Sequence, residues 1–122
     1  MKQDAAGRKG KFAAAFSGLG RILKDQSVVV HLCIGLAVII LGWFLQLDRE
    51  EFLILLFTIG MVLLAESTNS ILEGLMDFIH PQYHSKIGQL KDMAAGMVML
   101  ASIVALAIGL VLFFPKFLDF LQ

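Results

Sequence analysis

The stretch that decides the fold is residues 63–77, which read LLAESTNSILEGLMD. The flanking sequence is apolar enough for a membrane helix, yet the stretch carries three acids and an amide, namely Glu66, Asn69, Glu73 and Asp77. At about 100° per residue, these side chains fall within a stripe about 80° wide on one helix face. A carboxylate near the bilayer centre costs about 2.5–3.5 kcal/mol on insertion scales. We therefore expect the stripe to face one site, the alternative being a polar seam between packed helices.

The composition predicts one membrane-embedded domain over residues 1–122. The chain is 58% hydrophobic with a mean hydropathy of +0.82, too apolar for an ordinary soluble domain. Ten basic residues balance ten acidic ones, so net charge indicates no partner class, and we expect no nucleic acid to bind. The lone Cys33 excludes a disulfide framework and predicts a buried, inert thiol. We expect no cleavable signal peptide.

Three apolar runs predict transmembrane helices at residues 26–47, 52–79 and 90–114, since about 20 residues cross the hydrocarbon core. A polar turn separates the first two runs. Residues 80–88 are expected to form a loop, because Pro81 and Gly88 interrupt helices. The fold class is therefore an all-α membrane protein.

The ends of these runs carry further signals. Pro115 is expected to end the third span, and Trp43 suits an interfacial anchor near the end of the first. His31, near the start of the first span, is expected to be an interfacial histidine rather than a ligand.

The N-terminal segment differs from the rest of the chain. Residues 1–10 are expected to be mobile, and residues 11–25 to form an amphipathic helix on the membrane surface. Its apolar face would consist of Phe12, Phe16, Leu19 and Leu23. The alternative is a helix packed against the bundle.

Basic residues predict the orientation. The first 24 residues hold six of them against one acid, and the 80–92 loop adds Lys86 and Lys91. By the positive-inside rule, the N-terminus and this loop are cytoplasmic and the C-terminus lies outside, although Lys116 opposes the rule. Glu66 then lies in the cytoplasmic leaflet, and the rest of the stripe reaches the interface.

The predicted stripe suits phosphate and metal chemistry. Carboxylates and an amide supply the oxygen ligands that Mg²⁺ takes, usually together with waters and substrate phosphates. Lys91, followed by Asp92 at the start of the third span, adds a cation for phosphate oxygens. A GxxxxGK[ST] loop and a Gly-rich kinase loop are both absent from the sequence, so the chain belongs to neither of those nucleotide-binding classes.

These residues resemble the signature of the small prokaryotic diacylglycerol kinase and undecaprenol kinase family, over about residues 12–117. The matching residues are Glu66-x-x-Asn69-x-x-x-Glu73-x-x-x-Asp77, then Tyr83-His84, then Gly88-x-x-Lys91-Asp92-Met93-Ala94-Ala95-Gly96. The resemblance implies three transmembrane helices preceded by a surface helix, in a bacterial inner membrane. It also implies a homotrimer with sites between subunits, which transfers the γ-phosphate of MgATP to a lipid hydroxyl.

The resemblance also implies roles for individual residues. Glu66 would be the general base and, with Ala95, would contact the lipid substrate. Glu73 would bind Mg²⁺ and ATP. The other ATP-binding residues would be Asn69, Asp77, Lys91 and Asp92.

The family's second metal-binding acid is a glutamate near the end of the surface helix. Asp25 or Gln26 occupies that position here, depending on which flanking residue sets the count. We choose Asp25 as the residue that would bind the metal and ATP, because a carboxylate neutralises Mg²⁺ better than an amide.

The sequence leaves two alternatives for the identity of the acceptor lipid. Residues 112–116 (LFFPK) and 30–32 (VHL) resemble the undecaprenol kinase branch, which favours undecaprenol over diacylglycerol. A hypothesis of another class is a non-catalytic membrane scaffold or accessory subunit.

Overall fold

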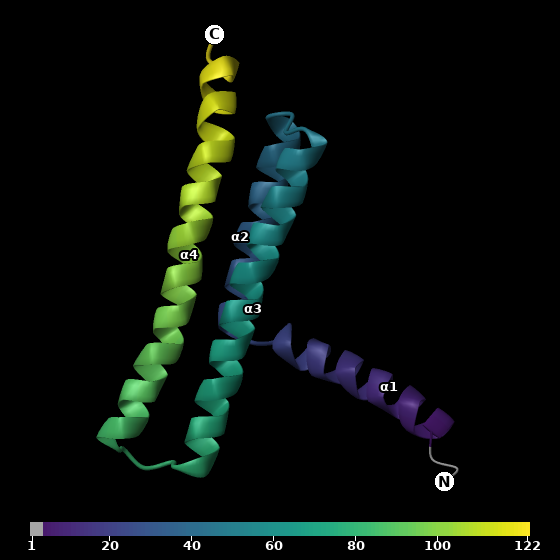
Figure 1. The fold of residues 1–122 in the computed structure, drawn as a ribbon, viewed down its shortest axis with the longest axis vertical. Coiled ribbons are helices and arrows are strands. Elements are labelled where there is room, and N and C mark those ends of the chain that lie inside the picture. The colour runs from purple at the N-terminus through teal and green to yellow at the C-terminus, as the bar shows by residue number, and fades with distance from the viewer. Residues whose placement is uncertain (1–3) are drawn as a thin grey trace.

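The computed structural model describes residues 4–122, which form four helices joined by short connections (Figure 1). These helices are α1 (Asp4–Ile22), α2 (Gln26–Phe44), α3 (Arg49–Ile79) and α4 (Ser85–Phe120). Of these, α2, α3 and α4 are long and apolar enough to cross a membrane. The predicted all-α fold with three candidate spans is confirmed.

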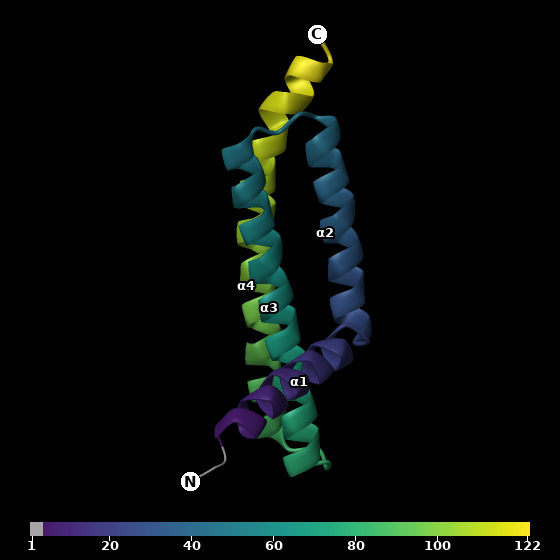
Figure 2. The ribbon, with the colours of Figure 1, turned by 90° about the vertical axis from the view of Figure 1, so that its right-hand side faces the viewer.

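Helix α1 leaves the bundle sideways, as Figures 1 and 2 show from two directions. Its predicted apolar face is exposed in the single chain, with Phe12 at 66% and Phe16 at 72%. The face therefore does not pack against the chain's own bundle. The helix begins at Asp4, so residues 4–10 are helical, whereas residues 1–10 were expected to be mobile. Residues 1–3 lie outside the described residues.

The turn between α2 and α3 is fixed by local hydrogen bonds. Gln46 has a left-handed φ of 56°, and its N–H donates to the Trp43 carbonyl at 3.2 Å. The Leu47 N–H donates to the Gly42 carbonyl at 3.0 Å, which completes a Schellman motif. Asp48 then begins α3 with a capping box, so this turn sets the antiparallel register of the two helices.

Helix α3 is the central helix, because it packs against both α4 and α2. Two glycines of α2 permit the close approach of α3. A Cβ at Gly35 would lie 2.8 Å from Cγ2 of Ile59, and a Cβ at Gly42 would lie 3.3 Å from Cδ2 of Leu55. The small buried core consists of Leu47, Leu55 and Leu112. Most other apolar side chains point outward, as expected where the solvent is lipid. Cys33 is also exposed, so the prediction of a buried thiol was wrong for the single chain.

Helix α4 is longer at both ends than the sequence predicted. His84 caps its start by accepting a hydrogen bond from the Lys86 N–H at 3.1 Å, so Gly88 lies within the first turn instead of breaking it. Pro115 lies inside the helix rather than ending it. Beyond the proline, Lys116 pairs with Glu51 at 3.0 Å, and the Phe120 ring packs on Phe44 with centroids 5.6 Å apart. These contacts hold the last turns in place despite the hydrogen bond that proline cannot make.

Candidate functional site

Helix α3 carries the polar stripe along the side where the helices meet, and Glu66 is its buried member. Glu66 is only 5% exposed, although most of the surrounding apolar side chains are open to lipid. Its Oε2 atom lies 3.9 Å from Nδ1 of His31 on α2. His31 was expected to be an interfacial histidine rather than a ligand, because the spacing along the chain does not show that α2 brings it to α3.

One turn further along α3, Asn69 and Glu73 are joined directly. Asn69 donates from Nδ2 to Oε1 of Glu73 at 3.2 Å. The Oδ1 atom of Asn69 is buried and has no hydrogen-bond partner among the described residues. A buried acceptor without a partner costs about 1–3 kcal/mol. This oxygen is therefore free to accept a hydrogen bond from a bound ligand.

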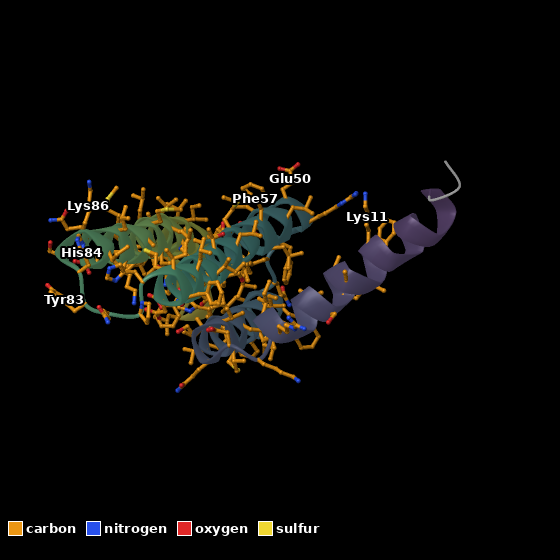
Figure 3. The ribbon with its side chains drawn as sticks, turned by 90° about the horizontal axis from the view of Figure 1, so that it is seen from below. Lys11, Glu50, Phe57, Tyr83, His84 and Lys86 are labelled. Carbon is orange, nitrogen blue, oxygen red and sulfur yellow. The ribbon has the colours of Figure 1, made fainter. Side chains whose placement is uncertain are left out.

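The stripe ends at an ion pair between α3 and α4. Nζ of Lys91 lies 2.5 Å from Oδ1 of Asp77, with the two side chains 34% and 63% exposed. The pair connects the helices beside their connecting loop, where Figure 3 shows Tyr83 and Lys86 projecting away from the helices. Lys91 can exchange this partner for a phosphate oxygen because the site is open to water.

Asp25 lies where α1, α2 and α3 meet. Its Oδ1 accepts hydrogen bonds from the N–H groups of Ser27 and Val28, at 3.0 and 3.3 Å, and so caps the start of α2. Asp25 also lines a cavity of about 190 Å³, together with Arg21 of α1 and Ser67 and Ser70 of α3. Gln26, the alternative ligand, is exposed and is not among the residues that line this cavity.

The structure does not join the last two predicted site residues to the stripe. Asp92 and Ala95 are exposed on α4, whereas the neighbouring Ala94 is buried. Asp92 makes no hydrogen bond or ion pair with the stripe in the described part of the chain. Both residues face away from the chain's own core, so a nucleotide, a lipid or another subunit can reach them.

The oxygen atoms of these side chains suit a Mg²⁺ ion that is bound partly by the protein and partly by water and phosphates. Within residues 4–122, no three His, Cys, Asp or Glu side chains gather closely enough to form a metal cage. Mg²⁺ is usually held by one or two carboxylates plus phosphates and waters, so such a cage is not required. Glu73, with Asn69 beside it, supplies the oxygen donors that this mode of binding needs.

The sequence is similar to one family model and to several known proteins. Residues 13–113 match the family model for prokaryotic diacylglycerol kinase. The undecaprenol kinase of Bacillus subtilis is 30% identical over 92 residues, which are 75% of each chain. The diacylglycerol kinase of Escherichia coli is 34% identical over 82 residues, which are 67% of this chain and 66% of that protein. The diacylglycerol kinase of Synechocystis is 32% identical over 110 residues, covering 88% of this chain and 63% of the relative.

Proposed function

The chain belongs to the prokaryotic diacylglycerol kinase family, and from this premise we propose that it phosphorylates undecaprenol with MgATP at the membrane surface. Membership of the family makes the protein a membrane-embedded, ATP-dependent lipid kinase. The acceptor, the metal and the roles of single residues are parts of the proposal. The main observation behind the proposal is that α3 carries a buried carboxylate, Glu66, on the same helix face as exposed polar groups nearer its end.

The order of groups along α3 supports a division of labour. At about 1.5 Å per residue, Glu73 lies about 10 Å and Asp77 about 16 Å beyond Glu66. Figures 1 and 2 show α3 and α4 continuing past the level where α1 joins α2. If α1 lies on the membrane surface, Glu66 is at lipid depth and the other two acids are in water. A lipid hydroxyl can then approach Glu66 while a nucleotide binds near Asp77.

We propose that Glu66 acts as the general base. The lipid hydroxyl oxygen attacks the γ-phosphorus of ATP, and its proton passes to the Glu66 carboxylate. The new lipid oxygen–phosphorus bond forms as the bond between the γ-phosphorus and the β,γ-bridging oxygen breaks, and ADP leaves. General-base catalysis contributes about 10²–10⁴-fold to such a step.

The remaining residues would position the nucleotide. Asn69 would hold Glu73 and donate its second amide hydrogen to a phosphate oxygen, while Lys91 would leave Asp77 to bind phosphate oxygens. Mg²⁺, when bound, neutralises phosphate charge. Glu73 and Asp25 would hold it.

Further contacts with the nucleotide and the lipid would come from the exposed face of α4. Asp92 would contact the nucleotide, and Ala95 would contact the lipid.

We propose a homotrimer in a bacterial inner membrane, with the N-terminus and the 80–92 loop in the cytoplasm. As the resemblance implies, the site would then lie between subunits, where a neighbouring copy contributes to it. The cytoplasmic placement is supported by the basic residues of the N-terminal segment and by Lys86 and Lys91. Lys116, which opposes the rule, has its charge balanced by Glu51.

The acceptor is tested by one assay on purified protein. Radiolabelled ATP is supplied with undecaprenol or diacylglycerol in matched mixed micelles, and kcat/KM is compared. The chain is similarly identical to the undecaprenol kinase of Bacillus subtilis and the diacylglycerol kinase of Escherichia coli, so sequence identity does not decide the substrate. Our choice of undecaprenol therefore depends on residues 112–116. A preference for diacylglycerol would reverse that choice and leave the kinase assignment intact. Phosphorylation of neither lipid would favour the scaffold hypothesis.

A further inference from the structure

We infer that His31 is a positioning residue for Glu66, holding one carboxylate oxygen so that the other is presented to the lipid hydroxyl. The inference rests on the proposed role of Glu66 as general base. It assigns a function to a side chain of α2, whereas the residues placed in the reaction so far lie on α3, on α4 and at the α1–α2 junction.

The tautomer of His31 follows from its hydrogen bond within α2. Nδ1 lies 2.9 Å from the carbonyl oxygen of Ser27, four residues earlier. A carbonyl oxygen can only accept, so Nδ1 must carry the hydrogen. The same N–H lies 3.9 Å from Oε2 of Glu66. The donor is therefore already on the side of the ring that faces the carboxylate.

The surroundings leave Glu66 dependent on this donor. The Glu66 side chain is 7% exposed, and His31 is the only described residue that pairs with it within 4.0 Å. His31 also lines a cavity of about 560 Å³ whose other lining residues are almost all apolar. Thr58 and Ser102 also line this cavity. The Thr58 hydroxyl donates to the carbonyl of Ile54 at 2.7 Å, and neither hydroxyl makes a hydrogen bond with Glu66 in the described part of the chain. A desolvated carboxylate gains most from a hydrogen-bond donor when water is excluded.

The separation of 3.9 Å is longer than a hydrogen bond. Catalytic hydrogen bonds are often long before substrate binds and shorten in the reactive complex. A small rotation of the imidazole about its side-chain bonds would move the N–H from the Ser27 carbonyl towards Glu66. Because both acceptors lie on one side of the ring, the donor can pass between them without a change of tautomer.

The first test uses three variants of His31. His31→Ala removes the donor, and we expect kcat to fall about 10- to 100-fold, the loss of one hydrogen bond to a charged group, with the KM for MgATP unchanged. His31→Asn places an amide near the position of Nδ1 and should restore part of the activity, whereas His31→Gln places it further out and should not. Cys33→Ala, an exposed neighbour on α2, is the matched control and should retain full activity.

A double-mutant cycle and a spectroscopic measurement separate positioning from folding. In a Glu66→Gln background, His31→Ala should cause little further loss of kcat, because the base is already removed. In ¹⁵N-histidine-labelled parent protein, Glu66→Gln should shift the His31 Nδ1 signal. Full activity in His31→Ala, equal losses in both backgrounds, or an unmoved Nδ1 signal would each overturn the inference. Failure of the proposed function would show instead as an inactive parent, and the Nδ1 signal would still report whether His31 and Glu66 interact.

Discussion

Lys91 on α4 pairs with Asp77 on α3, and a second pair, Lys116 with Glu51, joins the same two helices at their opposite ends. The two ion pairs thus connect α3 and α4 at both ends of the hairpin, and the apolar contacts lie between them. The two pairs differ in what they can do. Glu51 is also part of the cap of α3, whereas Lys91 has no other recorded partner among the described residues and can release Asp77 for a phosphate.

We predict that Lys91→Met raises the KM for MgATP about 10- to 100-fold, because it removes a charge-assisted contact with phosphate. Stability in detergent should change by less than about 1 kcal/mol, since exposed ion pairs contribute little. Steady-state kinetics at varied MgATP and a thermal melt measure both quantities. Lys86→Met is the matched control, because Lys86 is a lysine of the same segment without an ion pair in the described structure. An unchanged KM in Lys91→Met would remove Lys91 from the nucleotide site.

Close packing of α2 on α3 leads to a prediction about stability. Gly35→Ala brings a Cβ to within 2.8 Å of Cγ2 of Ile59, a methyl group that cannot swing aside freely. Overpacking costs about 1–3 kcal/mol, and the better helix propensity of alanine offsets about 1 kcal/mol of this. We expect a net loss of up to about 2 kcal/mol in denaturation in detergent.

Gly60→Ala is the control for this substitution. A Cβ at Gly60 meets nothing within 4 Å, so this variant should be as stable as the parent or slightly more stable. Equal stability of the two variants would show that α2 and α3 do not pack closely at Gly35.

The sequence predicted those parts of the fold that depend on the length of the apolar runs and on the helical spacing of polar residues. The spans followed from the lengths of the apolar runs, and the stripe followed from the spacing of Glu66, Asn69 and Glu73. The end of α4 was less predictable, because contacts between distant residues stabilise it. Pro115 is accommodated where Lys116 and Phe120 find partners on other helices.

Two features of the site were not predicted. Asp25 was predicted as a ligand and not as the cap of α2, although an aspartate directly before an apolar run is a helix-start signal. The proximity of His31 to Glu66 depends on how α2 packs against α3. The sequence offered one signal: in the first apolar run, residues 26–47, His31 and Cys33 are the only residues with titratable side chains.

The orientation can be tested by cysteine labelling in a Cys33→Ala background, which removes the exposed native thiol. Lys86→Cys should react with a membrane-impermeant reagent only from the cytoplasmic side, because the 80–92 loop is predicted to be inside. Glu50→Cys, at the other end of the bundle and exposed, should react only from outside (Figure 3). The reverse pattern would place the proposed nucleotide site away from cytosolic ATP and contradict the model.

The metal assignment is tested with Glu73→Gln. A neutral amide is a poorer ligand for a hard cation, so we expect lower turnover and a shift of the Mg²⁺ response to higher concentrations. The variant should retain its fold, because Glu73 is exposed and Asn69 is its only hydrogen-bond partner among the described residues. Lipid phosphorylation measured across a Mg²⁺ series provides the test. An unshifted Mg²⁺ response would exclude Glu73 as a ligand.

Glu66→Gln separates catalysis from packing, because the amide keeps the size of the side chain and removes the base. We predict a fall in kcat of about 10²–10⁴-fold with a modest change in the KM for MgATP, since the proton is taken up only during reaction. The variant should remain folded, because an amide is cheaper than a carboxylate to place in the membrane. Lipid phosphorylation and thermal stability in detergent are measured on the same preparation. Full activity would exclude Glu66 as the base. Unfolding, together with an inactive parent, would instead favour a polar seam, in which the burial of Glu66 against α2 serves helix packing alone.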